Sequence, residues 1–181
     1  MAQTKKYVLL DRDGVINHDS GDFIKSADEW LPIDKSLEAI ALLSKQGYQV
    51  VIITNQSGVG RGLYNDAILT DMHLKMTRMT EAIGGKISHI YYCPHLPDAG
   101  CECRKPKPGM LHQFSQDAGV PLDEIYFIGD SLRDIEAGIA AGAKPILVKT
   151  GNGAKTLAAH PDLNIPIFEN LYDAAEYILS R

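Results

Sequence analysis

The chain has 181 residues, of which 45% are hydrophobic and 23% charged, values typical of a globular domain with one buried core. The formal net charge of −5, from 23 acidic and 18 basic residues, argues against general nucleic-acid binding, which usually requires a basic excess. No apolar run approaches the ~20 residues of a membrane span, and the first residues lack a signal-peptide core. Three cysteines, an odd number, do not suit a disulfide-stapled secreted fold. We therefore expect one cytoplasmic domain over 1–181, a monomer without membrane or nucleic-acid partners.

Short apolar runs alternate with helical patterns along the whole chain. Strands are predicted where the runs are apolar and rich in β-branched or aromatic residues, at 7–10, 49–53, 87–92, 125–128 and 145–148. Helices are predicted where apolar residues recur every three or four positions: from Asp34 as N-cap to Gly47, over 68–83, from Pro108 to Gly119, and from 132 to Gly142. A glycine-rich loop is expected at 58–62, and a short strand and a helix within 165–180. This alternation predicts one α/β domain, a doubly wound parallel sheet with helices on both faces.

Ligands of such sheets bind beyond the carboxyl ends of the strands. Four segments there carry polar or ionisable residues directly after an apolar run: 11–17, 54–57, 93–107 and 130–134. Their convergence predicts one functional site.

Two pairs of carboxylates stand out in these segments. Asp11 and Asp13 lie two positions apart where the first strand ends, and Gly14 lets the chain turn behind them. Asp130 and Asp134 follow the fourth strand. Because gathered carboxylates repel one another, a hard divalent cation such as Mg²⁺ is the expected partner. In the alternative interpretation, these residues only cap a loop and a helix.

The motifs Asp11-Arg-Asp-Gly-Val, Thr54, Lys105 and Gly129-Asp-Ser-Leu-Arg-Asp occur in the order found in haloacid dehalogenase-like (HAD) phosphohydrolases, which the chain resembles over nearly its whole length. The resemblance implies that Asp11 is the nucleophile and forms an aspartyl-phosphate, and that Asp13 is the general acid and then the base. It also implies that Thr54 and Lys105 contact the phosphoryl group. Mg²⁺ would be held by Asp11, Asp130 and the backbone carbonyl of Asp13. Asp134 would orient metal-bound water or be a solvated helix residue.

The segment 93–108 combines all three cysteines with a histidine: Cys93, His95, Cys101 and Cys103. Three thiolates and one imidazole complete the tetrahedral coordination of Zn²⁺ and leave no open position for water, so this metal would be structural. It would also fix the two cations that follow, Arg104 and Lys105. A disulfide between two of the cysteines, or free thiols, are the alternatives.

This zinc loop, with Val15-Ile-Asn17 and Thr54-Asn-Gln-Ser-Gly58, narrows the resemblance to heptose bisphosphate phosphatases. That family removes the 7-phosphate on the route to nucleotide-activated heptose for lipopolysaccharide core or surface sugars. The related histidinol-phosphatases of histidine biosynthesis share the loop, but more often have Thr-Leu after the catalytic glycine, and they are the alternative. The gap between His95 and Cys101 is shorter than in some heptose enzymes, which leaves the preferred anomer open.

Candidate substrate-binding residues lie beside the predicted catalytic groups. The family resemblance brings the loop of Asp19, Ser20, Gly21 and Asp22 near sugar hydroxyls, although such a sequence also suits a simple polar turn. The other candidates are Asn55, Gln56, Ser57 and Arg104. Arg104 is a fork donor suited to phosphate or sugar oxygens, and Arg61 is either a second anion-binding residue or a solvated one.

No interval between the motifs is long enough for a large cap domain, so the predicted site is open and suits a small phosphosugar. A polynucleotide 3′-phosphatase would also use an open site, but the negative net charge argues against it. A non-catalytic sugar-phosphate sensor is the alternative from another functional class. The complete catalytic set argues against a sensor, which has no need of an acid/base residue such as Asp13.

Overall fold

The computed structural model describes residues 4–181. Its strands form one parallel sheet in the order β3-β2-β1-β4-β5-β6. The strands are β1 (Lys6–Leu10), β2 (Tyr48–Asn55), β3 (Ile87–Cys93), β4 (Tyr126–Gly129), β5 (Lys144–Val148) and β6 (Ile167–Phe168). This order confirms the predicted doubly wound sheet.

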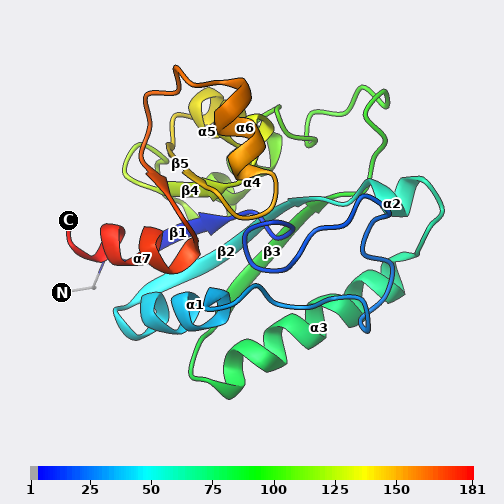
Figure 1. Cartoon of the computed structure of the whole chain (residues 1–181), viewed down its shortest axis with the longest axis horizontal. Coiled ribbons are helices and arrows are strands. Elements are labelled where there is room, and N and C mark those ends of the chain that lie inside the picture. Colours follow the sequence, from blue (N-terminus) through cyan, green and yellow to red (C-terminus); the bar gives the residue numbers. More distant parts are fainter. Residues whose placement is uncertain (1–3) are drawn as a thin grey trace.

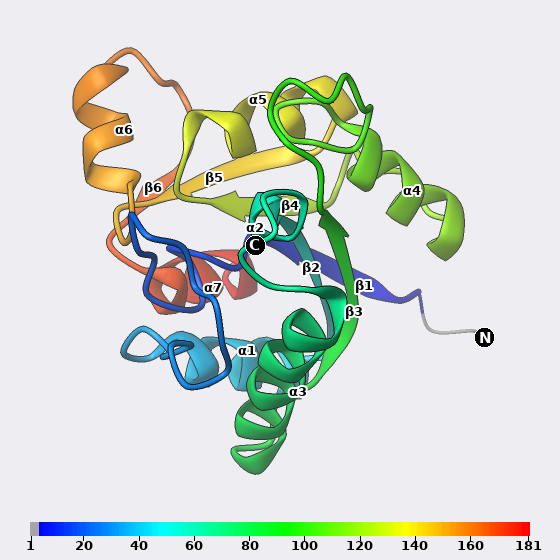
Figure 2. The ribbon, with the colours of Figure 1, turned by 90° about the vertical axis from the view of Figure 1, so that its right-hand side faces the viewer.

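Helices cover both faces of the sheet (Figures 1 and 2). One face carries α1 (Ser36–Lys45), α3 (Asp66–Ala82) and α7 (Leu171–Leu179). The other carries α4 (Gly109–Ala118) and α5 (Leu132–Ala141). Two short helices, α2 (Ser57–Gly60) and α6 (Gly153–Ala159), follow the carboxyl ends of β2 and β5.

Alternating side chains of the central strands build two hydrophobic cores. In β1, Val8 and Leu10 pack toward α1, α3 and α7, whereas Leu9 packs toward α4, and all three are fully buried. Successive residues of a strand point to opposite faces, so a strand covered on both sides is apolar throughout. The sheet therefore holds the ends of β1, β2 and β4 rigidly side by side.

Several predicted helix boundaries were wrong. Asp34 does not cap α1; the N-cap is Lys35, in a left-handed conformation with φ 62°, and Ser36 begins the helix while donating to the Ile16 carbonyl at 2.6 Å. Pro108 is an N-cap, not the first helical residue. Part of the predicted loop at 58–62 forms α2.

The predicted apolar face of α3 extends beyond the core. Met72 and Met76 are buried, but Met79 and the C-cap residue Ile83 are 37% and 47% exposed. Helix α6 was not predicted, since its seven residues carry no repeating apolar pattern.

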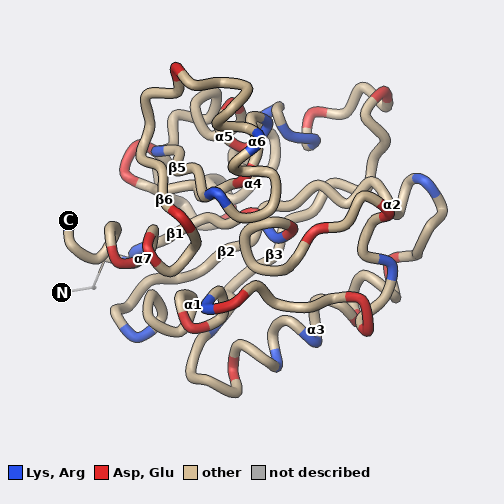
Figure 3. Tube along the Cα trace, in the orientation of Figure 1, with Lys and Arg blue, Asp and Glu red and all other residues tan. Residues whose placement is uncertain are grey.

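Charged residues of both signs are spread along the chain. Figure 3 shows Lys and Arg positions interspersed with Asp and Glu positions along the described trace. Within 4–181, the segments joining the motifs form no cap domain, and 11–35 runs as a loop between β1 and α1. None of the helices in this part of the chain is long and apolar enough to cross a bilayer.

Candidate active site

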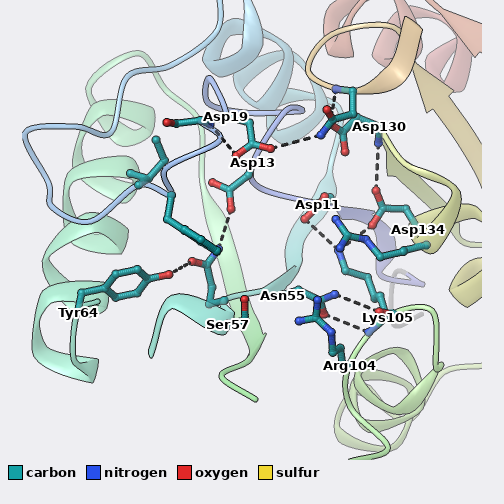
Figure 4. A pocket seen from close by; sticks show the side chains of 16 residues that line it. Asp11, Asp13, Asp19, Asn55, Ser57, Tyr64, Arg104, Lys105, Asp130 and Asp134 are labelled. Atoms are coloured by element: carbon teal, nitrogen blue, oxygen red, sulfur yellow. Dashed lines mark hydrogen bonds and ion pairs between the residues drawn. The ribbon is translucent and has the colours of Figure 1, made fainter. Parts of the chain in front are cut away.

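A polar cavity of about 160 Å³ lies at the carboxyl ends of β1, β2 and β4 (Figure 4). Asp11 and Asp13 come from the loop after β1, Lys105 and Arg104 from the zinc loop, and Asp130 from the end of β4. The complete lining is Asp11, Asp13, Asp19, Ser20, Phe23, Ile24, Asn55, Gln56, Ser57, Tyr64, Arg104, Lys105, Asp130, Arg133, Asp134 and Asn152. Residues of all four predicted strand-end segments thus line one cavity.

Lys105 links two of the carboxylates. Its Nζ lies 2.9 Å from Asp11 Oδ1 and 2.7 Å from Asp134 Oδ1, and donates to the Ile53 carbonyl at 2.8 Å. Burial acts to lower the pKa of Lys105, but the two carboxylates outweigh it and raise that pKa, so the side chain is an ammonium. Burial also acts to raise the pKa of Asp134, but Lys105 prevails and lowers it.

The ion pair with Lys105 does not fully compensate the charge of Asp11. Burial first, and then the neighbouring Asp134 charge, raise its pKa well above the ordinary value, despite the ion pair with Lys105. Burial and Asp134 likewise raise the pKa of Asp130 to about 7. A divalent cation between the two would favour the ionised form of both.

Carboxylate oxygens of Asp11, Asp130 and Asp134 lie within 4.8 Å of one another. Asp134 is already saturated: its Oδ2 accepts from the backbone N–H groups of Asp130 and Ser131 and from the Ser131 hydroxyl, at 2.9 to 3.2 Å. It therefore orients Lys105 and the β4–α5 turn, and its carboxylate is not a solvated one. Asp11 and Asp130 keep oxygen lone pairs for a hard cation, and these donors fit Mg²⁺.

Gly14 is required beside these carboxylates. Its φ is 81°, a left-handed conformation that side chains rarely adopt, and a Cβ there would overlap Asp130 Oδ2. The Gly14 carbonyl also accepts from Thr150 at 2.7 Å. The glycine thus lets the loop after β1 pass directly against the end of β4.

Asp13 is held by four hydrogen bonds. Its Oδ1 accepts from Arg12 Nη2 and Nε at 2.7 and 3.0 Å and from Asn17 at 2.9 Å. Its Oδ2 accepts from Gln56 Nε2 at 2.9 Å. Burial acts to raise the pKa of Asp13, but the buried Arg12 guanidinium and these hydrogen bonds outweigh it and lower that pKa. The Asp13 side chain is therefore an ionised carboxylate in the protein without substrate.

The last residues of β2 mainly organise their neighbours. Asn55 makes a two-bond clamp on the Lys105 backbone, donating to its carbonyl at 3.1 Å and accepting from its N–H at 3.0 Å. Thr54 is fully buried and lies outside the cavity lining; its hydroxyl accepts from Gln56 at 2.9 Å. Ser57 lines the cavity directly.

Only half of the predicted sugar-binding loop reaches the cavity. Asp19 and Ser20 line it, whereas Gly21 and Asp22 are exposed outside its lining. Gly21 belongs instead to an adjoining surface hollow.

The Cys93, His95, Cys101 and Cys103 side chains meet in the zinc loop. Cys93 Sγ lies 3.0 Å from Cys103 Sγ, 3.7 Å from Cys101 Sγ and 3.3 Å from His95 Nδ1. Zn–S and Zn–N bonds of about 2.3 and 2.0 Å give tetrahedral edges of about 3.5–3.8 Å. The separations here lie at or somewhat below these edges, and three thiols with one imidazole are a donor set that suits Zn²⁺. No disulfide joins Cys93, Cys101 and Cys103 in the described chain.

Comparison with known proteins identifies the family. The chain is 49% identical over 176 residues to the D-glycero-β-D-manno-heptose-1,7-bisphosphate 7-phosphatase of Pseudomonas aeruginosa, a match that covers 97% of this chain and 99% of that protein. The protein of the same name from Neisseria meningitidis is 46% identical, over 97% and 96%. This chain belongs to the heptose bisphosphate phosphatase family.

The match extends to structure. The crystal structure of the D,D-heptose 1,7-bisphosphate phosphatase from B. bronchiseptica, complexed with magnesium and phosphate, has a TM-score of 0.94 and 46% identity, and covers 97% of this chain and 98% of that one. A family model described as HAD-hydrolase-like matches residues 102–174. These findings confirm the predicted resemblance and do not favour the histidinol-phosphatase or sensor alternatives.

Sequence reasoning missed part of the heptose bisphosphatase cavity: Phe23, Ile24, Tyr64, Arg133 and Asn152. Arg133 lies inside the motif that supplied Asp130 and Asp134, and Asn152 follows β5, so the strand-end rule applied to a fifth strand would have found it. Tyr64 follows no strand, and nothing local in the sequence singles it out.

Proposed function

We propose that this protein is a Mg²⁺-dependent phosphomonoesterase that removes the 7-phosphate of D-glycero-β-D-manno-heptose 1,7-bisphosphate. The observation that carries the proposal is Asp11, with its Oδ1 2.9 Å from the Lys105 ammonium, in a cavity also lined by Asp13 and Asp130. The two relatives described above are named for the β anomer, which supports that anomer here. The product would serve nucleotide-activated heptose synthesis.

The reaction divides between Asp11 and Asp13. A carboxylate oxygen of Asp11 attacks phosphorus. Asp13 first takes up a proton from solvent as the anionic substrate binds, and the bond from phosphorus to the sugar oxygen breaks as Asp13 donates that proton to the oxygen. Asp13, now a carboxylate, then takes a proton from the water that hydrolyses the aspartyl-phosphate. Lys105 neutralises phosphoryl charge. The Thr54 hydroxyl accepts from Gln56 and donates to the Asn55 carbonyl at 3.4 Å, so it would have to turn away from that carbonyl to reach a phosphoryl oxygen.

Asp11, Asp130 and the backbone carbonyl of Asp13 would hold Mg²⁺. When bound, the ion neutralises charge on the phosphoryl oxygens. It also lowers the pKa of Asp11, so that the side chain is present as the nucleophilic carboxylate. The hard oxygen donors and the magnesium of the B. bronchiseptica phosphatase structure support this assignment.

Cys93, His95, Cys101 and Cys103 would hold a structural Zn²⁺, which their separations of 3.0 to 3.7 Å favour. The ion would tie down the loop that carries Arg104 and Lys105. Three reduced cysteines also suit the cytoplasm. The monomeric state and the absence of nucleic-acid partners stay predictions.

Arginines favour a bisphosphate over histidinol phosphate, which carries an amine. Arg104 and Arg133 line both the cavity and an adjoining hollow that also includes Lys107. Burial lowers the pKa of Arg104, and the facing Arg133 charge lowers it further, so an anion between them would be stabilised. The second phosphate of the substrate supplies that anion. Asp19, Ser20 and Ser57 remain candidates for the sugar hydroxyls.

The test is Mg²⁺-dependent phosphate release from the two anomers of heptose 1,7-bisphosphate and from histidinol phosphate. Asp11→Asn, which keeps the size of the side chain but removes the nucleophile, is the blank. A large kcat/KM advantage for the β anomer, lost in Asp11→Asn, supports the proposal. An advantage for histidinol phosphate, or tight binding of the bisphosphate without turnover, contradicts it.

A further inference from the structure

The Tyr64 and Gln56 side chains form a hydrogen-bonded chain that ends on Asp13. Figure 4 labels the two ends of this chain, Tyr64 and Asp13. We propose that Tyr64, acting through Gln56, is a positioning residue that holds the Asp13 carboxyl group for proton transfer to the leaving oxygen. This inference rests on the proposed function, because it concerns the acid/base role of Asp13. It also gives Gln56 a role other than the substrate binding predicted from the sequence.

The orientation of the Gln56 amide is determined by its partners. Its Nε2 donates to Asp13 Oδ2 and to Thr54 Oγ1, both at 2.9 Å, and its Oε1 accepts from the Tyr64 hydroxyl at 2.6 Å. The opposite orientation would set the amide oxygen against a carboxylate oxygen, two acceptors with no hydrogen between them. All polar groups of this amide are thus used within the protein.

The two oxygens of Asp13 are not equivalent. Oδ1 accepts three hydrogen bonds, two from Arg12 and one from Asn17, whereas Oδ2 accepts one, from Gln56. Oδ2 therefore keeps the lone-pair capacity to carry a proton between the protein and the substrate. Since Gln56 is its hydrogen-bond partner in the described chain, the amide fixes the plane in which that proton is presented.

Tyr64 is itself held rigidly. Its ring is 5% exposed and packs against Gly58 of α2, where a Cβ would lie 2.6 Å from Cζ and 2.7 Å from the hydroxyl oxygen. Burial raises the pKa of Tyr64 to about 12, so its hydroxyl keeps the proton that it donates to Gln56. The glycine at 58 thus provides the space for a fixed donor.

Leaving-group dependence separates positioning from a purely structural role. A sugar phosphate releases a poor, alkoxide-type leaving group that needs a proton, whereas p-nitrophenyl phosphate releases a stabilised phenolate that does not. We would measure kcat/KM for heptose 1,7-bisphosphate and for p-nitrophenyl phosphate with each variant. The ratio of the two values is independent of the fraction of correctly folded protein.

Tyr64→Phe removes only the hydroxyl, and Tyr91→Phe is its matched control, because the Tyr91 hydroxyl donates to Asp117 at 2.7 Å away from the cavity lining. We expect the ratio of kcat/KM for the sugar phosphate to kcat/KM for the aryl phosphate to fall about tenfold in Tyr64→Phe. This loss is smaller than the whole contribution of a general acid, which is about 10²- to 10⁴-fold. The ratio should not change in Tyr91→Phe. An unchanged ratio in Tyr64→Phe would overturn the inference.

A double variant tests whether Tyr64 acts through Gln56. Gln56→Leu should lower the sugar-to-aryl ratio of kcat/KM at least as far as Tyr64→Phe does. The double variant should have the same ratio as Gln56→Leu alone. Additive losses would overturn the inference, because Tyr64 would then act by another route.

Asp13→Asn distinguishes a failure of the proposed function from a failure of the inference about Tyr64. If Asp13→Asn leaves the ratio at the wild-type value, the acid role of Asp13 in the proposed function fails, and the inference fails with it. If Asp13→Asn lowers the ratio and Tyr64→Phe does not, only the inference fails.

Discussion

Replacement of Lys105 by methionine tests the electrostatic centre of the site. The side chain is 2% exposed, and its ammonium group lies between Asp11 and Asp134 at 2.9 and 2.7 Å. Methionine has a similar length but no charge, so two carboxylates would remain buried side by side without a cation. Removing one partner of a buried pair costs about 3–5 kcal/mol. For a chain of this size, that corresponds to a fall in Tm of about 6–20 °C.

The measurement is thermal unfolding at pH 8, in the presence of a chelator so that no divalent cation replaces the lost charge. Lys149→Met is the matched control, since Lys149 pairs with Glu169 at 2.6 Å but its side chain is 38% exposed. An exposed pair contributes about 0–1 kcal/mol, so we expect little change in Tm for the control.

The pH dependence gives an independent check. In the wild type, Lys105 lowers the pKa of Asp134 below its usual 3.8, so this pair stabilises the fold above about pH 4 and stops doing so as the pH falls below that value. In Lys105→Met, burial raises the carboxyl pKa values instead, and protonation relieves the repulsion as the pH is lowered. The Tm difference should therefore shrink from pH 8 to pH 5. Equal losses for the two lysine variants, or a difference that grows at pH 5, would refute the reasoning.

Three further changes test other parts of the site. Cys101→Ser should lower zinc content and Tm together, as measured by metal analysis and thermal unfolding; one retained equivalent of zinc at an unchanged Tm would contradict the four-residue ligand set. Gly14→Ala should weaken Mg²⁺ activation by about ten- to a hundredfold, because its Cβ would overlap Asp130 Oδ2 at a φ of 81°; an unchanged activation constant would contradict the close approach. Arg104→Met should raise KM for the bisphosphate by about tenfold with kcat unchanged, the loss expected of a charged hydrogen bond; an unchanged KM would remove Arg104 from the binding of the second phosphate.

The location of the site could be predicted because it depends on local pattern. A continuous apolar run such as 7–10 makes a strand covered on both faces, and the polar residues after it must lie at the carboxyl edge of the sheet. Asp11 and Asp130 were found in this way, although 119 positions separate them (130 − 11). The cluster of Cys93 with His95, Cys101 and Cys103 was likewise readable, because few other groups of residues satisfy tetrahedral coordination.

Helix boundaries depended on contacts that the local sequence does not contain. Asp34 has the chemistry of an N-cap, yet α1 begins at Ser36, where the hydroxyl bonds to the distant Ile16 carbonyl. The short helix α2 forms with Gly58 against the Tyr64 ring. At the start of α1, a tertiary contact thus outweighed an N-cap preference of about 1 kcal/mol.

The sequence by itself determined the order of strands and helices, the carboxylates at the strand ends and the candidate metal ligands. Tertiary structure alone decided which partner each side chain has: Asp134 is committed to Lys105, and Gln56 to Tyr64 and Asp13. The physical reason is the separation along the sequence over which each effect acts. Hydrophobic periodicity acts between neighbours in the chain, whereas the contacts of Asp134 with Lys105 and of Gln56 with Asp13 form only when the fold brings atoms far apart in sequence to about 3 Å.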